Sequence, residues 1–71
     1  MICVKVVPSH VVECINKDKA ILDEILNALK ERLGVEEYIV VVNGKVVSNH
    51  SIVVSKNDEV VLVQAFMGGS T

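Results

Sequence analysis

The sequence holds one segment of helical periodicity among short β-branched runs, and this combination limits the folds open to the chain. In residues 18–33, apolar side chains recur at three- and four-residue steps, which predicts one face of an amphipathic helix. The apolar positions are Ile21, Leu22, Ile25, Leu26, Leu29 and Leu33. Asp18 or Asn16 is the expected N-terminal cap, and Gly34 the expected left-handed C-terminal cap. A single helix must bury this stripe on one face of a sheet.

The sheet is expected to come from β-branched runs on both sides of the helix. The runs are 2–7, 11–15, 38–42 and 59–65, with shorter pieces at 45–47 and 52–55. Pro8-Ser9-His10 and Asn43-Gly44 are typical of tight turns between antiparallel strands. The order is therefore ββαβ(β)β, and crossover handedness places the first and last strands side by side and parallel. This order predicts an α+β β-grasp (ubiquitin-like) fold, a mixed sheet packed on a single helix.

Length and charge exclude several classes of function. A chain of 71 residues forms one domain, with little room for a deep active-site cavity. The net charge of −2, with one Tyr, one Phe and no Trp, argues against binding to nucleic acid. The longest apolar stretch, 38–42, is too short to span a membrane, and the chain opens without a secretion leader. A cytoplasmic protein is expected.

The side chains that often carry chemistry do not form a catalytic or metal-binding pattern. Cys3 and Cys14 can lie close across the first hairpin, but we expect two separate thiols rather than a disulfide or redox pair. His10 and His50 fall in expected turns. The Glu36-Glu37 pair has no accompanying nucleophile or positioned base, so it is expected to be solvated charge. The sequence therefore predicts neither an enzyme nor a metal site.

The last residues, Ala65 to Thr71, have a composition that the fold does not explain. A final strand runs directly into Gly68-Gly69, with no further element to follow. We expect a β-grasp domain over residues 1–66 and a flexible tail over residues 67–71. A frayed end would also tolerate small residues.

Together these features resemble the ubiquitin-like sulfur carriers of the ThiS and MoaD type. The residues that carry the resemblance are 42–47 (Val-Asn-Gly-Lys-Val-Val), 57–60 (Asn-Asp-Glu-Val) and 66–69 (Phe-Met-Gly-Gly). The resemblance implies that an ATP-dependent activating enzyme adenylates the carboxylate of Gly69, after which sulfur replaces AMP. The resulting thiocarboxylate would serve a sulfur-accepting synthase in thiamine or molybdopterin synthesis, or tRNA thiolation. The chain itself would bind no cofactor. Some archaeal relatives are joined to lysines of target proteins instead.

The tail has the physical properties that such chemistry needs, with one departure from the family pattern. The residues from Gln64 to Gly69 reach about 20 Å when extended, and glycines pass through a narrow channel. Phe66 and Met67 are expected to be apolar anchors outside that channel. The alternatives are that they are exposed without a role or fold back onto the sheet. Ser70-Thr71 follow the glycine pair, whereas the family's functional form ends at the second glycine. Three explanations are open: a protease trims these two residues, they are not part of the natural chain, or the tail has no chemical role.

Alternation along the strands predicts a docking surface for the activating enzyme. Val41, Val61 and Val63 are expected on the open side of the sheet, where polar residues would be usual. The alternatives are that valine is there only because it favours strands, or that the register is shifted by one residue. A second class of function also stays open, a ubiquitin-like binding module with an inert tail.

Overall fold

The computed structural model describes residues 1–34 and 37–64, and within these residues the chain forms seven strands and one helix. The strands are β1 (Ile2–Val7), β2 (Val11–Ile15), β3 (Lys19–Ile21), β4 (Tyr38–Val42), β5 (Lys45–Val47), β6 (Val53–Ser55) and β7 (Val60–Gln64), and the helix is α1 (Leu22–Leu33). Most bounds lie within a residue or two of those expected from the sequence. The tail residues 65–71, which include Phe66, Met67, Gly68 and Gly69, lie outside the described residues.

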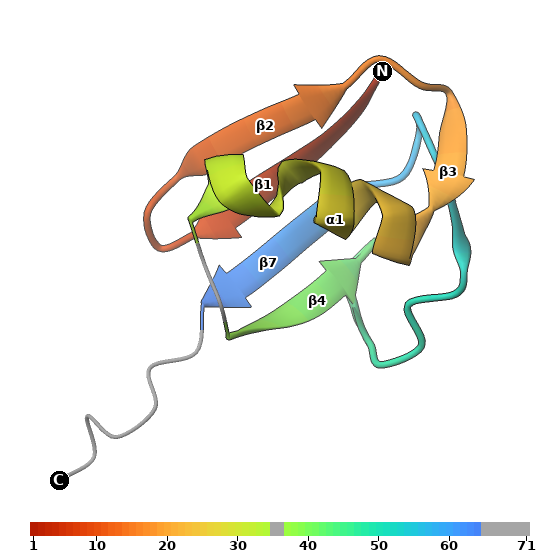
Figure 1. Cartoon of the computed structure of the whole chain (residues 1–71). Helices are drawn as coiled ribbons and strands as arrows, with labels where there is room; N and C mark the ends of the chain where they lie inside the picture. The colour runs from red at the N-terminus through yellow and green to blue at the C-terminus, as the bar shows by residue number, and fades with distance from the viewer. Residues whose placement is uncertain (35–36, 65–71) are drawn as a thin grey trace, which may run out of the picture.

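Five strands form one mixed sheet in the order β2-β1-β7-β4-β5 (Figure 1). The central strands β1 and β7 run parallel, with Val4 opposite Val60, and the remaining pairs are antiparallel. The predicted parallel pairing of the first and last strands is therefore confirmed. This arrangement of a mixed sheet and one helix is the predicted α+β β-grasp.

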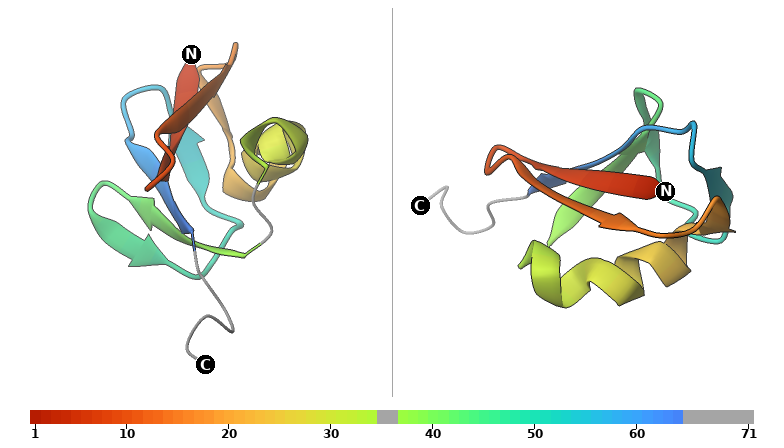
Figure 2. Two further views of the ribbon diagram at one scale, coloured as in Figure 1. Left: turned by 90° about the vertical axis from the view of Figure 1, so that its left-hand side faces the viewer. Right: turned by 90° about the horizontal axis from the view of Figure 1, so that it is seen from above.

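The helix α1 covers one face of this sheet, as Figure 2 shows in its end-on view. Its apolar stripe supplies five buried residues, and Ile2, Val4 and Val6 meet them from β1, each with no exposed surface. The rest of the core comes from both sheets. Its other members are Ala20, Val40, Val54, Val60 and Leu62. Burying a large aliphatic side chain contributes about 1.5–3 kcal/mol, so this face holds the fold together.

The start of the helix differs from the prediction. Residues 19–21 form β3, so α1 begins at Leu22 rather than near Asp18, and no side chain caps it. Instead, the backbone amides of Leu22 and Asp23 donate to the carbonyls of Ile52 and His50, both at 2.9 Å. Because loop carbonyls satisfy these first-turn donors, a capping carboxylate at Asp18 or amide at Asn16 is unnecessary. The helix ends as predicted at Gly34, in the left-handed conformation with φ 68°.

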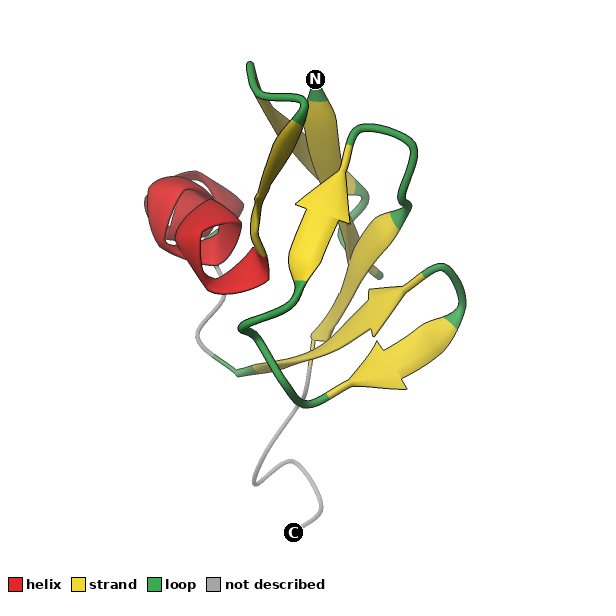
Figure 3. Ribbon diagram, turned by 90° about the vertical axis from the view of Figure 1, so that its right-hand side faces the viewer, coloured by secondary structure: helices red, strands yellow, loops and turns green. Residues whose placement is uncertain are grey.

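The strand β3 pairs with β6 in a separate two-stranded sheet beside the start of the helix (Figure 3). Ala20 and Val54 face the core, whereas Ile21 and Val53 are opposite one another and exposed. The prediction that Ile21 belongs to the helix stripe was therefore wrong. Its apolar side chain fits the three-residue spacing, but its backbone is committed to pairing with Val53.

Candidate functional site

The face of the five-stranded sheet opposite α1 is the open face, and apolar side chains cover most of it. Strand register aligns them in rows. The central row crosses all five strands and consists of Val12, Lys5, Val61, Val41 and Val46. A second row, nearer the C-terminal end of β7, consists of Val7, Val63 and Ile39. Exposed apolar side chains gathered on one face often mark a surface that binds another protein.

Exposure of these side chains confirms which way the strands face. Val12, Val46, Ile39 and Val63 are 53, 73, 47 and 37% exposed, whereas Val41 and Val61 are half-buried between neighbouring strands. The three predicted valines, Val41, Val61 and Val63, therefore lie on the open face, and the alternative register is excluded. The sequence did not point to Val12, Ile39 or Val46, because their places in the rows follow from pairing between strands.

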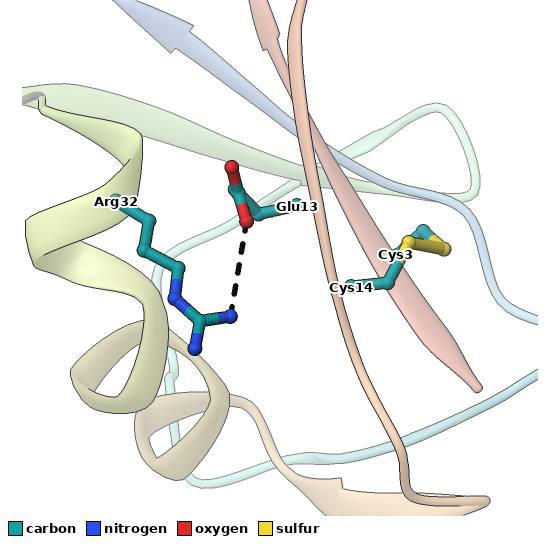
Figure 4. The surroundings of a disulfide bond; sticks show 4 residues. All are labelled: Cys3, Glu13, Cys14 and Arg32. Atoms are coloured by element: carbon teal, nitrogen blue, oxygen red, sulfur yellow. Dashed lines mark ion pairs between the residues drawn. A yellow bond between two sulfur atoms is a disulfide. The ribbon is translucent and has the colours of Figure 1, made fainter.

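A single charge lies among these outward-facing strand positions of the described residues. Lys5 occupies the central row with Val12 on one side and Val61 on the other. The carboxylate of Glu13 lies on the helix side of β2, where it faces Arg32 of α1 at 3.8 Å (Figure 4). A protein that binds this face must therefore be complementary to an apolar surface with one positive charge near its centre.

The structure joins Cys3 and Cys14 in a disulfide, so the prediction of two separate thiols was wrong. The two residues are direct partners in the antiparallel pairing of β1 and β2. Facing residues in an antiparallel ladder bring their side chains close together on the same side. Their sulfur atoms project on the side of β2 away from Glu13 and Arg32, at one end of the open face (Figure 4). The sequence placed both cysteines in one hairpin, but the pairing depends on the register of its two strands, which the structure defines.

Two of the sequence motifs are connected by hydrogen bonds. Asn43 and Gly44 both have positive φ, 53° and 82°, as the predicted hairpin turn requires. The Asn43 side-chain amide donates to Asp58 Oδ1 at 3.0 Å, and its Oδ1 accepts from the Glu59 amide at 2.9 Å. The Ser55 amide donates to Asp58 Oδ2 at 2.9 Å. These bonds hold the turn between β4 and β5 against the start of β7.

The same bonds set the charge state of Asp58. The hydrogen bond from Asn43, and after it those from Ser55, hold the pKa of the Asp58 carboxyl below its usual value, since they favour the ionised form. The bonded pair Asn43 and Asp58 therefore has a structural role, because it positions the strands β5 and β7. Its hydrogen bonds do not require a bound substrate.

The histidines and the glutamate pair noted in the sequence do not form a common site in the described residues. His10 is exposed in the turn after β1, and His50 lies in the loop before β6. Glu37 is exposed, and Glu36 lies outside the described residues. Across residues 1–34 and 37–64, no group of three or more His, Cys, Asp or Glu side chains is placed to hold a metal ion. The same residues include no helix that is long and apolar enough to cross a membrane.

The sequence matches a known protein family over most of its length. The model of the ThiS family matches residues 6–69, which is most of the chain. The chain belongs to the ThiS family. It is thus a ubiquitin-like β-grasp protein of a family of small sulfur carriers. Comparison with curated protein sequences gave no match. The ThiS-family match extends through both tail glycines and ends at Gly69, before Ser70-Thr71.

Proposed function

We propose that this ThiS-family chain is a substrate rather than a catalyst, carrying sulfur on the carboxylate of Gly69. The observation that carries the proposal is that the family match runs to the second glycine of the tail. The activating enzyme supplies ATP and all catalytic groups. A synthase then accepts the sulfur in the cytoplasm.

The chemistry requires two displacements at the tail. An oxygen of the Gly69 carboxylate attacks the α-phosphate of ATP and releases pyrophosphate, which gives an acyl adenylate. A hydrosulfide ion then attacks the acyl carbon and releases AMP and a proton, leaving a thiocarboxylate. Adenylation is needed because a free carboxylate is a poor electrophile. The tail must therefore enter another protein as a segment separate from the folded domain, residues 67–71 as encoded and 67–69 once Ser70-Thr71 are removed.

The open face is the proposed docking surface for the activating enzyme. Val63 pairs with Ile39 in the row nearest Gln64, the last described residue before the tail. A partner bound over this row is well placed to receive the chain that follows. Phe66 and Met67 would add apolar anchors between the docking surface and the glycines.

Comparing two chain ends tests the role of Gly69. The full-length chain and a form ending at Gly69 are each incubated with ATP and the cognate activating enzyme. We expect the acyl adenylate only from the form ending at Gly69, because Thr71 is β-branched and a glycine-shaped channel should reject it. Equal adduct formation from both forms would refute the need for trimming. No adduct from either would refute the carrier function.

Intact mass of the protein from its own cells separates the remaining alternatives. Loss of Ser70-Thr71, together with the mass gain from replacing one oxygen by sulfur, supports the carrier. A ladder of lysine conjugates indicates a protein modifier instead. An unmodified chain ending at Thr71 indicates a binding module that uses only its open face.

Matched variants test the docking surface. Val63→Asp and Val41→Asp should weaken binding of the activating enzyme while circular dichroism stays that of a folded domain. Val53→Asp is the control, because Val53 is exposed on the small β3–β6 sheet rather than on the open face. Equal binding by all three variants would exclude this docking surface.

A further inference from the structure

The Cys3–Cys14 disulfide lies on the surface of the fold rather than in its core. Cys3 is exposed and Cys14 is half-buried, whereas the adjacent positions Ile2 and Val4 point to the opposite face and are fully buried. Opening the disulfide therefore creates no cavity in the core and buries no polar group. The bond can open and close without repacking the apolar residues under the helix.

Disulfide exchange requires access to a sulfur atom from the side opposite the sulfur it is bonded to, and the strand order leaves that side of each cysteine uncovered by another strand of the described residues. In exchange, a thiolate attacks one sulfur and displaces the other. Cys14 belongs to β2, an edge strand of the five-stranded sheet. On the other side, the described pairing of β1 with β7 begins only at Val4 and Val60, one residue beyond Cys3. Among the described residues, no strand therefore lies directly beyond either cysteine, but the β1–β7 register continued by one residue places the exposed Glu59 beside Cys3.

The strand β2 keeps other attachments when the disulfide is open. It pairs with β1 through five residue pairs, from Ile2–Ile15 to Val6–Val11. Val11 and Ile15 pack against the core, and Glu13 faces Arg32 of the helix. The hairpin is thus held by packing on the face opposite the sulfur atoms. Reduction should loosen an edge strand but leave the domain folded.

A cation beside the disulfide indicates which thiols it should accept. Lys5 follows Cys3 by two residues, so it lies on the same face about 7 Å along the strand. Across the ladder, Val12 is opposite Lys5. A thiol compound with a carboxylate can place its charge near the Lys5 ammonium while its sulfur attacks the disulfide. Lys5 repels a thiol with a positive charge at the same position. The exposed carboxylate of Glu59, one residue before Val60, acts in the opposite sense from the β7 side, so the preference assigned here is the contribution of Lys5.

We propose that Cys3–Cys14 is a reversible exchange site for low-molecular-weight thiols, at which Lys5 favours thiols that carry a carboxylate. The incoming thiolate forms a mixed disulfide, with attack expected at the more exposed Cys3, and Cys14 leaves as a thiolate. A second thiol then attacks the sulfur of the bound compound, which releases Cys3 as a thiolate and the compound as its own disulfide. Two electrons pass from two thiols to the protein disulfide, and the cysteines take up the protons that the two thiols lose.

Glutathione and cysteamine are suitable probes, because glutathione has a net negative charge and cysteamine a positive one. The native protein is mixed with each thiol, the reaction is stopped with acid, free thiols are alkylated, and intact mass is measured. We expect one glutathione adduct per chain, followed by a form with two alkylated cysteines. Rates are normalised to the reaction of each thiol with a small neutral disulfide.

The variant Lys5→Gln tests the charge selection, with Lys45→Gln on the exposed edge strand β5 as the matched control. One unit-charge pair about 7 Å apart in water corresponds to about a threefold change in rate at low salt. Lys5→Gln should slow glutathione and speed cysteamine by about this factor, and Lys45→Gln should change neither rate. Equal effects of the two variants would overturn the assignment of Lys5.

Two results would overturn the exchange site itself. The first is a disulfide that opens only after urea unfolds the chain, because the sulfur atoms would then not be accessible in the native fold. The second is loss of the far-ultraviolet circular dichroism signal on reduction, which would make the bond a structural crosslink. Retained signal, with faster amide hydrogen exchange confined to β2, is the expected outcome.

Discussion

Removing the Cys3–Cys14 crosslink should lower the stability of the domain by an amount that follows from chain entropy. The bond joins residues 11 positions apart in sequence. Closing a loop of this length in the unfolded chain corresponds to about 3 kcal/mol at 25 °C. Chains of this size have unfolding free energies of about 4–11 kcal/mol. The crosslink thus contributes a large share of the free energy of unfolding, but its removal should leave the native state populated.

Urea unfolding followed by circular dichroism measures this contribution. For a small domain with a slope of about 1 kcal/mol per molar, the midpoint should fall by about 3 M on reduction. The double variant Cys3→Ser/Cys14→Ser should show the same fall, since both side chains lie on the open face and serine adds no buried polar group. Adding reductant to the double variant is the control and should change nothing. A midpoint that falls by less than about 0.5 M in both cases would contradict the reasoning.

Three further predictions concern the helix and the bonded turns. The hydrogen bond from Asn43 keeps the pKa of Asp58 in the fold below its ordinary value. The ionised carboxyl therefore stabilises the fold at every pH above the ordinary pKa, and this stabilisation is lost as the pH falls through the lowered pKa. Asp58→Asn should therefore lower the urea midpoint at neutral pH and flatten its decline in acid; a parallel pH profile would contradict this. Gly34→Ala should cost about 1–2 kcal/mol, because φ is 68° while no atom blocks the new Cβ within 4 Å; an unchanged thermal midpoint would contradict it. Leu29→Ala, at a 1% exposed core position, should cost about 2–5 kcal/mol in urea unfolding. The exposed control Asn27→Ala should change stability by less than about 0.5 kcal/mol.

The parts of the fold that the sequence predicted depend on patterns within single elements. The stripe from Leu22 to Leu33 has the helical period, and alternation in β1 distinguishes Val4 from Lys5. Asn43-Gly44 is a strong local turn signal, because both residues must adopt positive φ. These patterns left few ways to arrange one helix and a sheet. The parallel pairing of β1 and β7 then followed from connection rules.

The parts that the sequence missed depend on contacts between distant residues. Ile21 satisfies the helical period, but β6, more than thirty residues later, takes its backbone into a second sheet. The first-turn amides of α1 find carbonyls in the loop before β6, so local capping rules did not apply. The Cys3–Cys14 pairing needed the register of the hairpin, which the turn 8–10 did not define. For the candidate site, alternation identified three open-face valines, whereas the full rows required the strand order.

The proposed docking surface and the Cys3–Cys14 disulfide lie close enough on the open face for one partner to cover both. Cys3 and Val7 are four residues apart on β1, or about 13 Å along the strand, and Lys5 lies between them. An interface of standard size covers about 800 Å² on each partner, which corresponds to a disc of about 16 Å radius. A partner centred on Val61, next to Lys5, would therefore cover the disulfide as well as the row nearest the tail. A thiol compound bound to Cys3 would occupy part of the same surface, so docking and thiol exchange should exclude one another.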